Sequence, residues 1–222
     1  MPMQWMPICT LLCIHLLLSS ATSALATTRV IDGDTIEVDG RTMRLHGIDA
    51  PEAGQKCNDI GSATWRCGQA AVTAMEELVE GKSVVCDDRG SDGYGRTIAV
   101  CLANGSDIGG AMVAKGLAWA FRKYSGDYIP LEDNARTLKV GVWRHDTQTP
   151  WDFRAEKWAS AVQAVPNGCP IKGNISENGR IYHTPWSPWY SRTRINAKKG
   201  ERWFCDEAEA VAAGWRAPHW GR

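Results

Sequence analysis

The 222-residue sequence has no net charge, no CxxC motif and no apolar run long enough to cross a bilayer. The absence of CxxC argues against a zinc site built on paired cysteines. The longest apolar run near the start, residues 8–18, is too short for a membrane span. There is also no repeat period or low-complexity tract, so we expect ordinary globular domains.

The first 26 residues also lack any charged side chain. Their apolar run is followed by SATSALA, which ends in the small-x-small pattern Ala24-Leu25-Ala26 that a signal peptidase accepts. The usual Lys or Arg before the run is missing, and His15 interrupts it. We predict a signal peptide over residues 1–26, a mature chain that begins at Thr27 without a stable membrane anchor, and a secreted or periplasmic location.

The charge balance conceals an uneven distribution. Residues 27–164 carry 16 Lys+Arg against 20 Asp+Glu, whereas residues 165–222 carry 9 against 5 and hold five of the eleven tryptophans. A basic, Trp-rich tail behind an acidic body is typical of polyanion binding. The alternative, a solvated surface over a small aromatic core, stays open at this point.

Six cysteines remain after the leader, and an even number in an exported chain predicts disulfides. Two of them end apolar runs on either side of the turn-like RGSDGYG, so a hairpin would place them opposite each other. Two more are close together in a loop, and the last two are left for each other. The expected pairs are Cys86 with Cys101, Cys57 with Cys67, and Cys169 with Cys205.

A zinc site in the tail is the alternative to the last of these disulfides. Only Cys169, His183 and Cys205 could contribute ligands there. A structural zinc site needs four ligands, so one is missing and we favour the disulfide.

The order of predicted elements is strands, helix, hairpin, helix, strand, helix. Residues 28–51 alternate as two strands around the turn Asp39–Gly40. The remaining predicted elements are helices over 67–81, 106–116 and 130–141, a hairpin of 82–86 with 96–103, and a strand over 117–122. This α+β order is typical of an OB-type five-stranded β-barrel with three helices packed outside it.

A turn-rich break near residues 164–170 separates a smaller unit. It contains strand candidates at 179–185 and 201–205 and a short helix over 206–214, opened by Asp206 and Glu209 in capping-box spacing. So small a unit needs a disulfide for stability. We predict a barrel domain over 27–155, a linker over 156–168 and a C-terminal module over 169–222.

Carboxylates and arginines cluster in VIDGDTIEVDGRTMRLHGIDAPE, residues 30–52. If the strands pair in one barrel, Asp34 and Asp49 supply two hard oxygen ligands suited to Ca²⁺ or Mg²⁺. Arg44 and Arg96 offer planar guanidinium groups that match phosphate oxygens, and Glu52 is available to handle a water. Surface ion pairs on hairpins are the simpler alternative for each residue alone, but not for the ordered set.

Three stretches, VIDGDT, RLHGIDAPE and DGYGRTIA, resemble the signature segments of the staphylococcal nuclease family in order and spacing. With GVW at 141–143, the resemblance covers residues 29–143. It implies the OB-fold barrel and a Ca²⁺-dependent phosphodiester hydrolase, an endonuclease acting on DNA and RNA through water attack and leaving 3′-phosphates. A monomer is expected.

The resemblance also implies roles for individual residues. Asp34, Asp49 and the backbone carbonyl of Ala50 would ligate Ca²⁺, with Asp32 just outside these ligands. Glu52 would orient or deprotonate the attacking water, while Arg44 and Arg96 would clamp the phosphate and stabilise the leaving 5′-oxygen. Two tyrosines, Tyr94 and Tyr124, would contact the nucleotide.

The chain departs from the family pattern in three places. Gly93 stands where a Lys is expected, the loop before GYGR is short, and the body is acidic. The tail resembles a small module found behind such nuclease domains, and its partner is unknown. The competing hypothesis is a weakly active or non-catalytic envelope protein that binds nucleic acid or acidic polysaccharide, in connection with exopolysaccharide production. The presence of all five proposed residues favours the enzyme.

Overall fold

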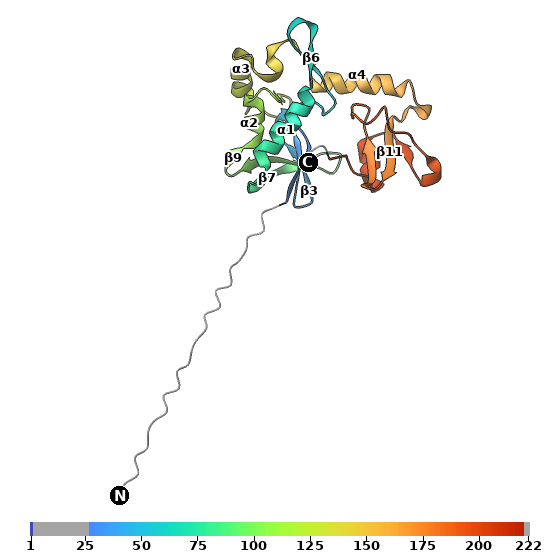
Figure 1. Ribbon diagram of the computed structural model, residues 1–222, viewed down its shortest axis with the longest axis horizontal. Coiled ribbons are helices and arrows are strands. Elements are labelled where there is room, and N and C mark those ends of the chain that lie inside the picture. The colour runs from blue at the N-terminus through green and yellow to red at the C-terminus, as the bar shows by residue number, and fades with distance from the viewer. Residues whose placement is uncertain (2–26, 220–222) are drawn as a thin grey trace.

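The computed structural model describes residue 1 and residues 27–219. The predicted signal peptide therefore lies almost entirely outside the described residues. Among the described residues, no helix is both long and apolar enough to span a membrane. The described chain forms a larger body and a smaller C-terminal module side by side, with helix α4 (Pro150–Val162) reaching from one to the other (Figure 1).

The larger body is built on the barrel sheet predicted from the sequence. Its strands are β1 Thr28–Asp32, β2 Thr35–Val38, β3 Arg41–Leu45, β4 Ile48–Asp49, β5 Cys57–Asn58, β6 Thr64–Trp65, β7 Val84–Ser91, β8 Thr97–Ala103, β9 Ser106–Asp107 and β10 Trp119–Ala120. The strand order in the main sheet is β1-β2-β3-β8-β7, and β9 pairs with β8. Two small pairs, β4 with β10 and β5 with β6, complete the body.

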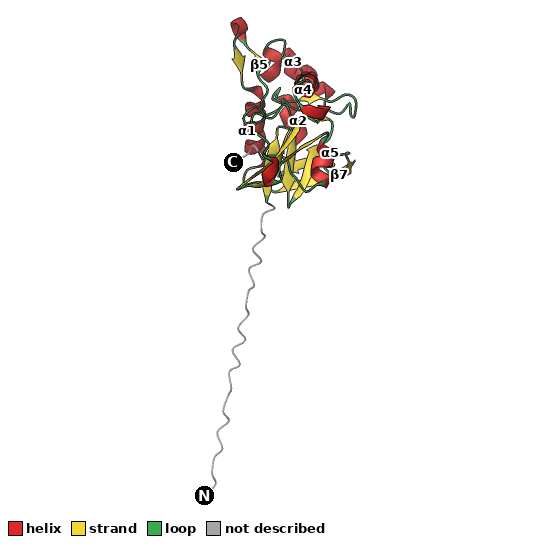
Figure 2. Cartoon of the chain, turned by 90° about the vertical axis from the view of Figure 1, so that its right-hand side faces the viewer, coloured by secondary structure: helices red, strands yellow, loops and turns green. Residues whose placement is uncertain are grey.

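Three helices pack on this sheet, which confirms the predicted OB-type α+β fold. They are α1 (Cys67–Val79), α2 (Ile108–Ala114) and α3 (Ile129–Thr137). Figure 2 shows α2 and α3 above the yellow barrel strands. The core between sheet and helices contains Ile36, Ile48, Met75, Ile108 and Met112, each at most 1% exposed.

Among the predicted boundaries in the body that differ from the structure, two have a local cause. The strand expected over 117–122 is only the two-residue β10, because the Phe121 carbonyl already accepts from the Tyr124 N–H at 2.9 Å in a turn. Helix α3 ends at Thr137 rather than Gly141, since Lys139 already adopts a positive φ of 51°.

The C-terminal module consists of a small antiparallel sheet and one helix. Its strands are β11 (Ile171–Ser176), β12 (Gly179–His183) and β13 (Arg202–Phe204), in the order β12-β11-β13, and its helix is α5 (Glu207–Ala212). The small core centres on Phe204 and Trp215, and Trp158 of α4 packs against it. The sequence does not predict β11, because Gly173 and Asn174 in its middle are residue types depleted in strands.

The sequence does not predict helix α4 either, and residues 156–162 of this helix fall in the stretch expected to be a linker. Its start is nevertheless encoded locally. The Thr149 hydroxyl accepts a hydrogen bond from the Asp152 N–H at 3.3 Å, and Pro150 occupies the first turn. Thr-x-x-Asp spacing with a Pro directly after the Thr was the available signal.

All three expected cysteine pairs are bonded. The disulfides join Cys57 to Cys67, Cys86 to Cys101 and Cys169 to Cys205. Cys86 and Cys101 are directly paired in the β7–β8 hairpin. Because Cys169 and Cys205 bond each other, neither is free to ligate zinc, and His183 instead hydrogen-bonds Ser187 and Asn174.

Candidate active site

The two aspartates expected to share an ion come from separate loops that the fold brings into contact. Asp34 lies in the turn between β1 and β2, and Asp49 ends β4. A Cβ on Gly33 would lie 2.8 Å from the Cβ of Ala50, so only glycine permits this close approach. The Asp34 carboxylate consequently accepts a hydrogen bond from the Ala50 N–H at 3.0 Å.

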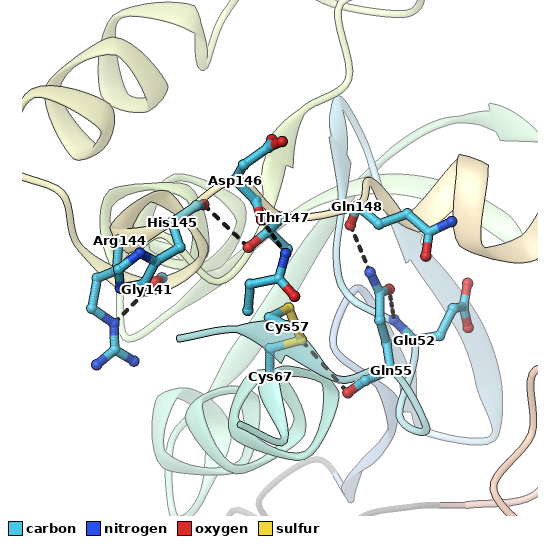
Figure 3. The surroundings of a disulfide bond; sticks show 11 residues. Glu52, Gln55, Cys57, Cys67, Gly141, Arg144, His145, Asp146, Thr147 and Gln148 are labelled. Carbon is cyan, nitrogen blue, oxygen red and sulfur yellow. Dashed lines mark hydrogen bonds between the residues drawn. A yellow bond between two sulfur atoms is a disulfide. The ribbon is translucent and has the colours of Figure 1, made fainter. Parts of the chain in front are cut away.

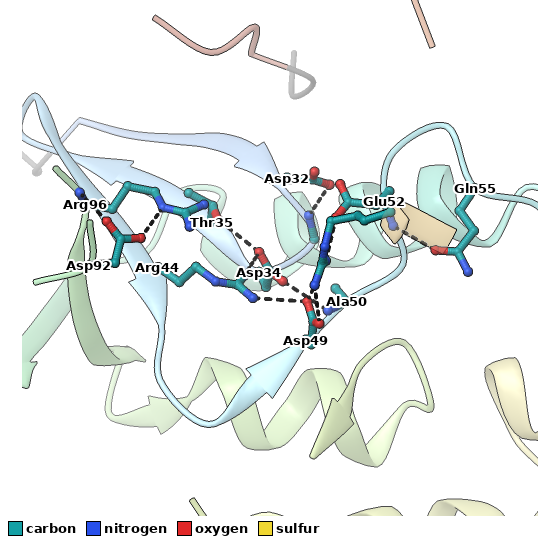
Figure 4. A network of polar contacts seen from close by, with 12 residues as sticks. Asp32, Asp34, Thr35, Arg44, Asp49, Ala50, Glu52, Gln55, Asp92 and Arg96 are labelled. Carbon is teal, nitrogen blue, oxygen red and sulfur yellow. Dashed lines mark hydrogen bonds and ion pairs between the residues drawn. The ribbon is translucent and has the colours of Figure 1, made fainter. Parts of the chain in front are cut away.

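Arg44 of β3 lies between these carboxylates, as Figure 4 shows. It forms a direct ion pair with Asp34 and another with Asp49, where Nη2 and Oδ1 are 3.0 Å apart. Burial alone would raise the pKa of Asp34, but the charge and hydrogen bond of Arg44 outweigh it and bring the pKa to about 2. Asp34 is therefore ionised throughout the physiological range.

A second guanidinium, which the sequence did not indicate, comes from Arg154 on helix α4. Its Nη1 and Nη2 donate to the Asp49 carboxylate at 3.1 and 2.8 Å, and Nη1 also donates to Glu52 at 2.7 Å. Asp49 is completely buried, so its charge is balanced by Arg44 and Arg154 rather than by water. No short motif marks Arg154, because its partners lie 105 and 102 residues earlier in the chain.

Glu52 and Asp32 share the remaining part of the acidic cluster. Burial, only partly offset by Arg154, raises the pKa of Glu52 to about 7. Burial, followed by the charges of Glu52 and Asp34, raises the pKa of Asp32 well above its usual range. These two carboxyl groups thus compete for ionisation, as close like charges do.

Contacts to the backbone N–H and carbonyl of Glu52 determine its position (Figure 3). The Gln55 side chain accepts from the Glu52 N–H at 3.2 Å and donates to the Gln148 carbonyl at 2.7 Å. Gly68, at the start of α1, lies so close to the Glu52 carbonyl that any added Cβ would collide with it. The disulfide between Cys57 and Cys67 closes the loop between these two contacts. Together they hold Glu52 against the segment that leads into α4.

Arg96 and Tyr94 lie at the other end of the cluster, after strand β7. The Arg96 Nε donates to Asp92 at 2.7 Å, and its guanidinium carbon is 5.5 Å from the centre of the Tyr94 ring. The Arg96 charge is close enough to help lower the pKa of Asp34. Tyr124 does not join this group; its side chain is exposed and its ring packs against Phe121.

These side chains line one cleft of about 550 Å³. The barrel contributes one wall, which includes Asp34, Arg44, Glu52, Tyr94 and Arg96. The other wall comes from α4 and the C-terminal module, through Arg154, Trp158, Tyr182, Trp186 and Trp215. The cleft is therefore shared between the two parts of the chain, and a barrel without the module would have a different site.

The donor chemistry of the cleft suits a hard divalent cation, because Asp34, Asp49, Glu52 and the Ala50 carbonyl all offer oxygen. Among the described residues, however, no three Asp, Glu, His or Cys side chains converge closely enough to hold one ion. The Arg154 guanidinium is paired with both Asp49 and Glu52. The ligand types present fit a hard divalent cation.

Two family models match the chain. Residues 42–145 match the model described as staphylococcal nuclease homologue, and residues 153–217 match the model described as ArfC. Asp32 and Asp34 precede the first match, and Arg154 belongs to the second. The site thus combines residues from both matched regions and from the strand before them.

Curated relatives match a little more than half of the chain. An uncharacterized endonuclease of Escherichia coli O157:H7 is 38% identical over 137 residues, which cover 58% of this chain and 83% of that protein. The micrococcal nuclease of Shigella flexneri is 32% identical over 144 residues, covering 57% of this chain and 77% of that protein.

The succinoglycan biosynthesis protein ExoI of Rhizobium meliloti (strain 1021) is 34% identical over 118 residues, covering 52% of this chain. The match spans only 62% of the length of ExoI. From the barrel, the cleft and these matches together, we conclude that this chain belongs to the family of staphylococcal nuclease homologues.

Proposed function

We propose that this protein is an exported, Ca²⁺-dependent nuclease that hydrolyses phosphodiester bonds of DNA and RNA. The observation that carries the proposal is the convergence of Asp34, Arg44, Glu52 and Arg96 on one cleft, with Asp49 buried against it. The names of the endonuclease and micrococcal nuclease relatives support the same reaction class. The three disulfides support an oxidising compartment, and hence export.

In this proposal Asp34, Asp49 and the Ala50 carbonyl hold the cation, with Asp32 behind them. The cation would polarise the phosphate and favour attack by water. Glu52 takes a proton from the attacking water, whose oxygen bonds to phosphorus. The bond from phosphorus to the 5′-oxygen breaks, that oxygen takes a proton from solvent water, and the product carries a 3′-phosphate.

Arg44 and Arg96 supply positive charge to the phosphate as it becomes more negative. Arg44 is fixed by its two aspartates, whereas Arg96 is held by Asp92 and the Tyr94 ring. Arg96 is therefore the less tightly held of the two clamps. Tyr94, which is 42% exposed at the cleft mouth, is placed to contact the nucleotide.

The Arg154 contacts are incompatible with this scheme, because the cation needs Asp49 and the attacking water needs a free Glu52, and Arg154 is paired with both. We infer that Arg154 leaves these carboxylates when Ca²⁺ binds and then faces the phosphate in the same cleft. Until then Arg154 neutralises two buried acids that would otherwise repel each other.

The competing hypothesis, an envelope protein that binds polyanions without cleaving them, has less support. A binding function does not need Asp34, Asp49 and Glu52 together at one point, since buried carboxylates repel a polyanion. The relative named for succinoglycan biosynthesis is the reason to keep an acidic polysaccharide as a second ligand in the assay.

The test uses the chain from Thr27 and single-stranded DNA, with Ca²⁺ or with a chelator. We expect cleavage only with Ca²⁺, 3′-phosphate ends on the products, and a loss of at least about 100-fold in kcat/KM for Arg96→Ala. Arg89→Ala is the matched control, because Arg89 is an exposed arginine paired with Asp87 outside the cleft. Equal cleavage by wild type and Arg96→Ala, or cleavage in the chelator, would overturn the proposal.

A further inference from the structure

A second hollow, of about 580 Å³, lies between the C-terminal module and the first barrel strand. Four arginines line it: Arg29 from β1, Arg192 and Arg194 from the loop after β12, and Arg216 near the end of the described chain. We refer to this hollow as the arginine groove. The nuclease roles proposed above make no use of it.

The groove carries an excess of positive charge, although Glu37 lies at its edge, opposite Arg29 in the β1–β2 pair and 3.8 Å from the His219 imidazole. None of the described residues lining it is Asp or Glu. Within the described chain, no ion pair joins any of its four arginines to a carboxylate. Two of them are instead oriented by backbone carbonyls, Arg194 by Ser191 at 2.7 Å and Arg216 by Asn178 at 2.8 Å. Such uncompensated, oriented guanidinium groups are typical of an anion site.

The groove is continuous with the catalytic cleft. Arg216, Pro218 and His219 line both hollows. Burial first, and then the nearby charges of Arg29 and Arg216, lower the pKa of His219, although Glu37 acts in the opposite direction. Arg96 lines the cleft and Arg216 lines both hollows, so a ligand long enough to occupy both would contact the two arginines.

The dimensions and the charge distribution identify the occupant. Each hollow has a volume typical of a small-molecule site. A hollow of this size admits one or two nucleotides of a single strand but not a duplex. The barrel region is net acidic, with 16 Lys+Arg against 20 Asp+Glu, so it offers little attraction to a long polyanion. The C-terminal region, with 9 against 5, reverses that balance on the side where the groove lies.

We propose that the arginine groove binds the phosphate backbone of a single nucleic-acid strand that extends from the catalytic cleft. This inference rests on the proposed nuclease function and adds the substrate class, a single strand several nucleotides long. The module thereby supplies the electrostatic affinity that the acidic barrel lacks.

The experiment measures binding rather than cleavage. A fluorescein-labelled oligothymidylate of about 30 nucleotides, long enough to span both hollows, is titrated with the chain from Thr27 in a chelator, at several salt concentrations, with fluorescence anisotropy as the readout. For the double variant Arg192→Ala/Arg194→Ala we expect about tenfold weaker binding and a salt dependence whose slope is smaller by about 1.4, the value for two phosphate contacts on a single strand. Arg29→Glu should weaken binding as well, because it acts from the barrel side.

The matched control is Lys198→Ala/Lys199→Ala, which removes the same charge from the exposed turn Ala197–Lys199 outside the groove. We expect its affinity to equal that of the wild type, and duplex DNA to compete poorly against the labelled strand. The proposal that the groove binds the strand would be overturned by equal losses of affinity in both double variants. Unchanged affinity after loss of Arg192 and Arg194 would overturn it as well. Because the assay needs no catalysis, a wild type that binds in this way but does not cleave would contradict only the proposed reaction.

Discussion

The guanidinium of Arg154 contacts both carboxylate oxygens of Asp49, at 2.8 and 3.1 Å, across 105 residues of sequence. The same group reaches Glu52 at 2.7 Å. Helix α4 presents Arg154 to these acids and, one turn later on the same face, Trp158 to the core of the C-terminal module. One helix face thus links the charge balance of the cleft to the packing of the module.

We predict that Arg154→Ala lowers stability without Ca²⁺ and strengthens Ca²⁺ binding. Removing one partner of a buried pair leaves Asp49 and Glu52 poorly compensated, which costs about 3 kcal/mol of unfolding free energy. A bound cation would replace the missing charge. Urea unfolding and calorimetric titration with Ca²⁺ measure the two effects.

The control for this variant is Lys157→Ala, which removes a partly exposed cation of the same helix that pairs with Glu156 on the surface. It should change neither quantity. Weaker Ca²⁺ binding in Arg154→Ala than in the wild type would contradict mutual exclusion of Arg154 and the cation.

Gln55 provides a test of how Glu52 is positioned. Gln55→Ala leaves the Glu52 N–H and the Gln148 carbonyl without the Gln55 side chain, which is itself buried. We expect a loss of about 2 kcal/mol in unfolding free energy, measured in urea. We also expect kcat to fall more than substrate affinity, because the orientation of Glu52 changes while the phosphate clamps stay in place.

Gln148→Ala is the comparison for Gln55→Ala. The Gln148 side chain donates to the exposed carboxylate of Glu156 at 2.9 Å, and the carbonyl that Gln55 uses belongs to the backbone and is retained. This variant should keep both stability and kcat close to those of the wild type. An equal fall in kcat for the two variants would argue against a positioning role for Gln55.

The disulfide between Cys169 and Cys205 should matter more to the module than to the barrel. Its two cysteines are 36 residues apart in the sequence, and a chain-entropy estimate for such a loop is about 4 kcal/mol. In the variant Cys169→Ala/Cys205→Ala we expect the module to unfold at a lower urea concentration than the barrel. Tryptophan fluorescence and limited proteolysis monitor the two transitions. A single transition at the wild-type midpoint would contradict this expectation.

His183 makes the stability of the module depend on pH. Burial, and then the charge of Lys172, lower the pKa of His183 from its usual value of about 6.5 to about 4. The unfolded chain therefore takes up a proton as the pH falls through this range and the folded chain does not, so unfolding becomes easier. The loss is at most about 3 kcal/mol.

Urea unfolding measures this dependence at two pH values, one near neutrality and one midway between the pKa of His183 in the folded chain and its pKa in the unfolded chain. The variant His183→Asn, which cannot take up the proton, is measured beside the wild type. The wild type should lose more stability between the two pH values than the variant. Equal losses would show that other groups are responsible.

The sequence predicted the barrel because its strands and helices carry strong local patterns. The turn at Asp39–Gly40, the helix that begins at Cys67 and the hairpin that pairs Cys86 with Cys101 each depend on nearby residues, and each is present. Helix α4 was missed, since its tryptophans pack against two different cores, Trp151 with Trp119 of the barrel body and Trp158 with the module, which local periodicity does not reveal.

The candidate site likewise contains residues that the sequence identified, whereas one expected residue lies elsewhere. The DGD and DAPE segments, with Arg44 between them, were identified from order and spacing, and they meet because β1 to β4 are consecutive elements of the barrel. Tyr124 was expected in the nucleotide pocket but is not among the residues that line the cleft, because the chain turns directly after β10.

What the sequence determined by itself is therefore the set of chemical groups: carboxylates and guanidinium groups in a fixed order, six cysteines after residue 26, and a basic C-terminal region. Only the tertiary structure decided which charges balance one another. Ion pairing depends on distance in space, and α4 folds back to bring Arg154 to Asp49 and to place the module's arginines beside the cleft.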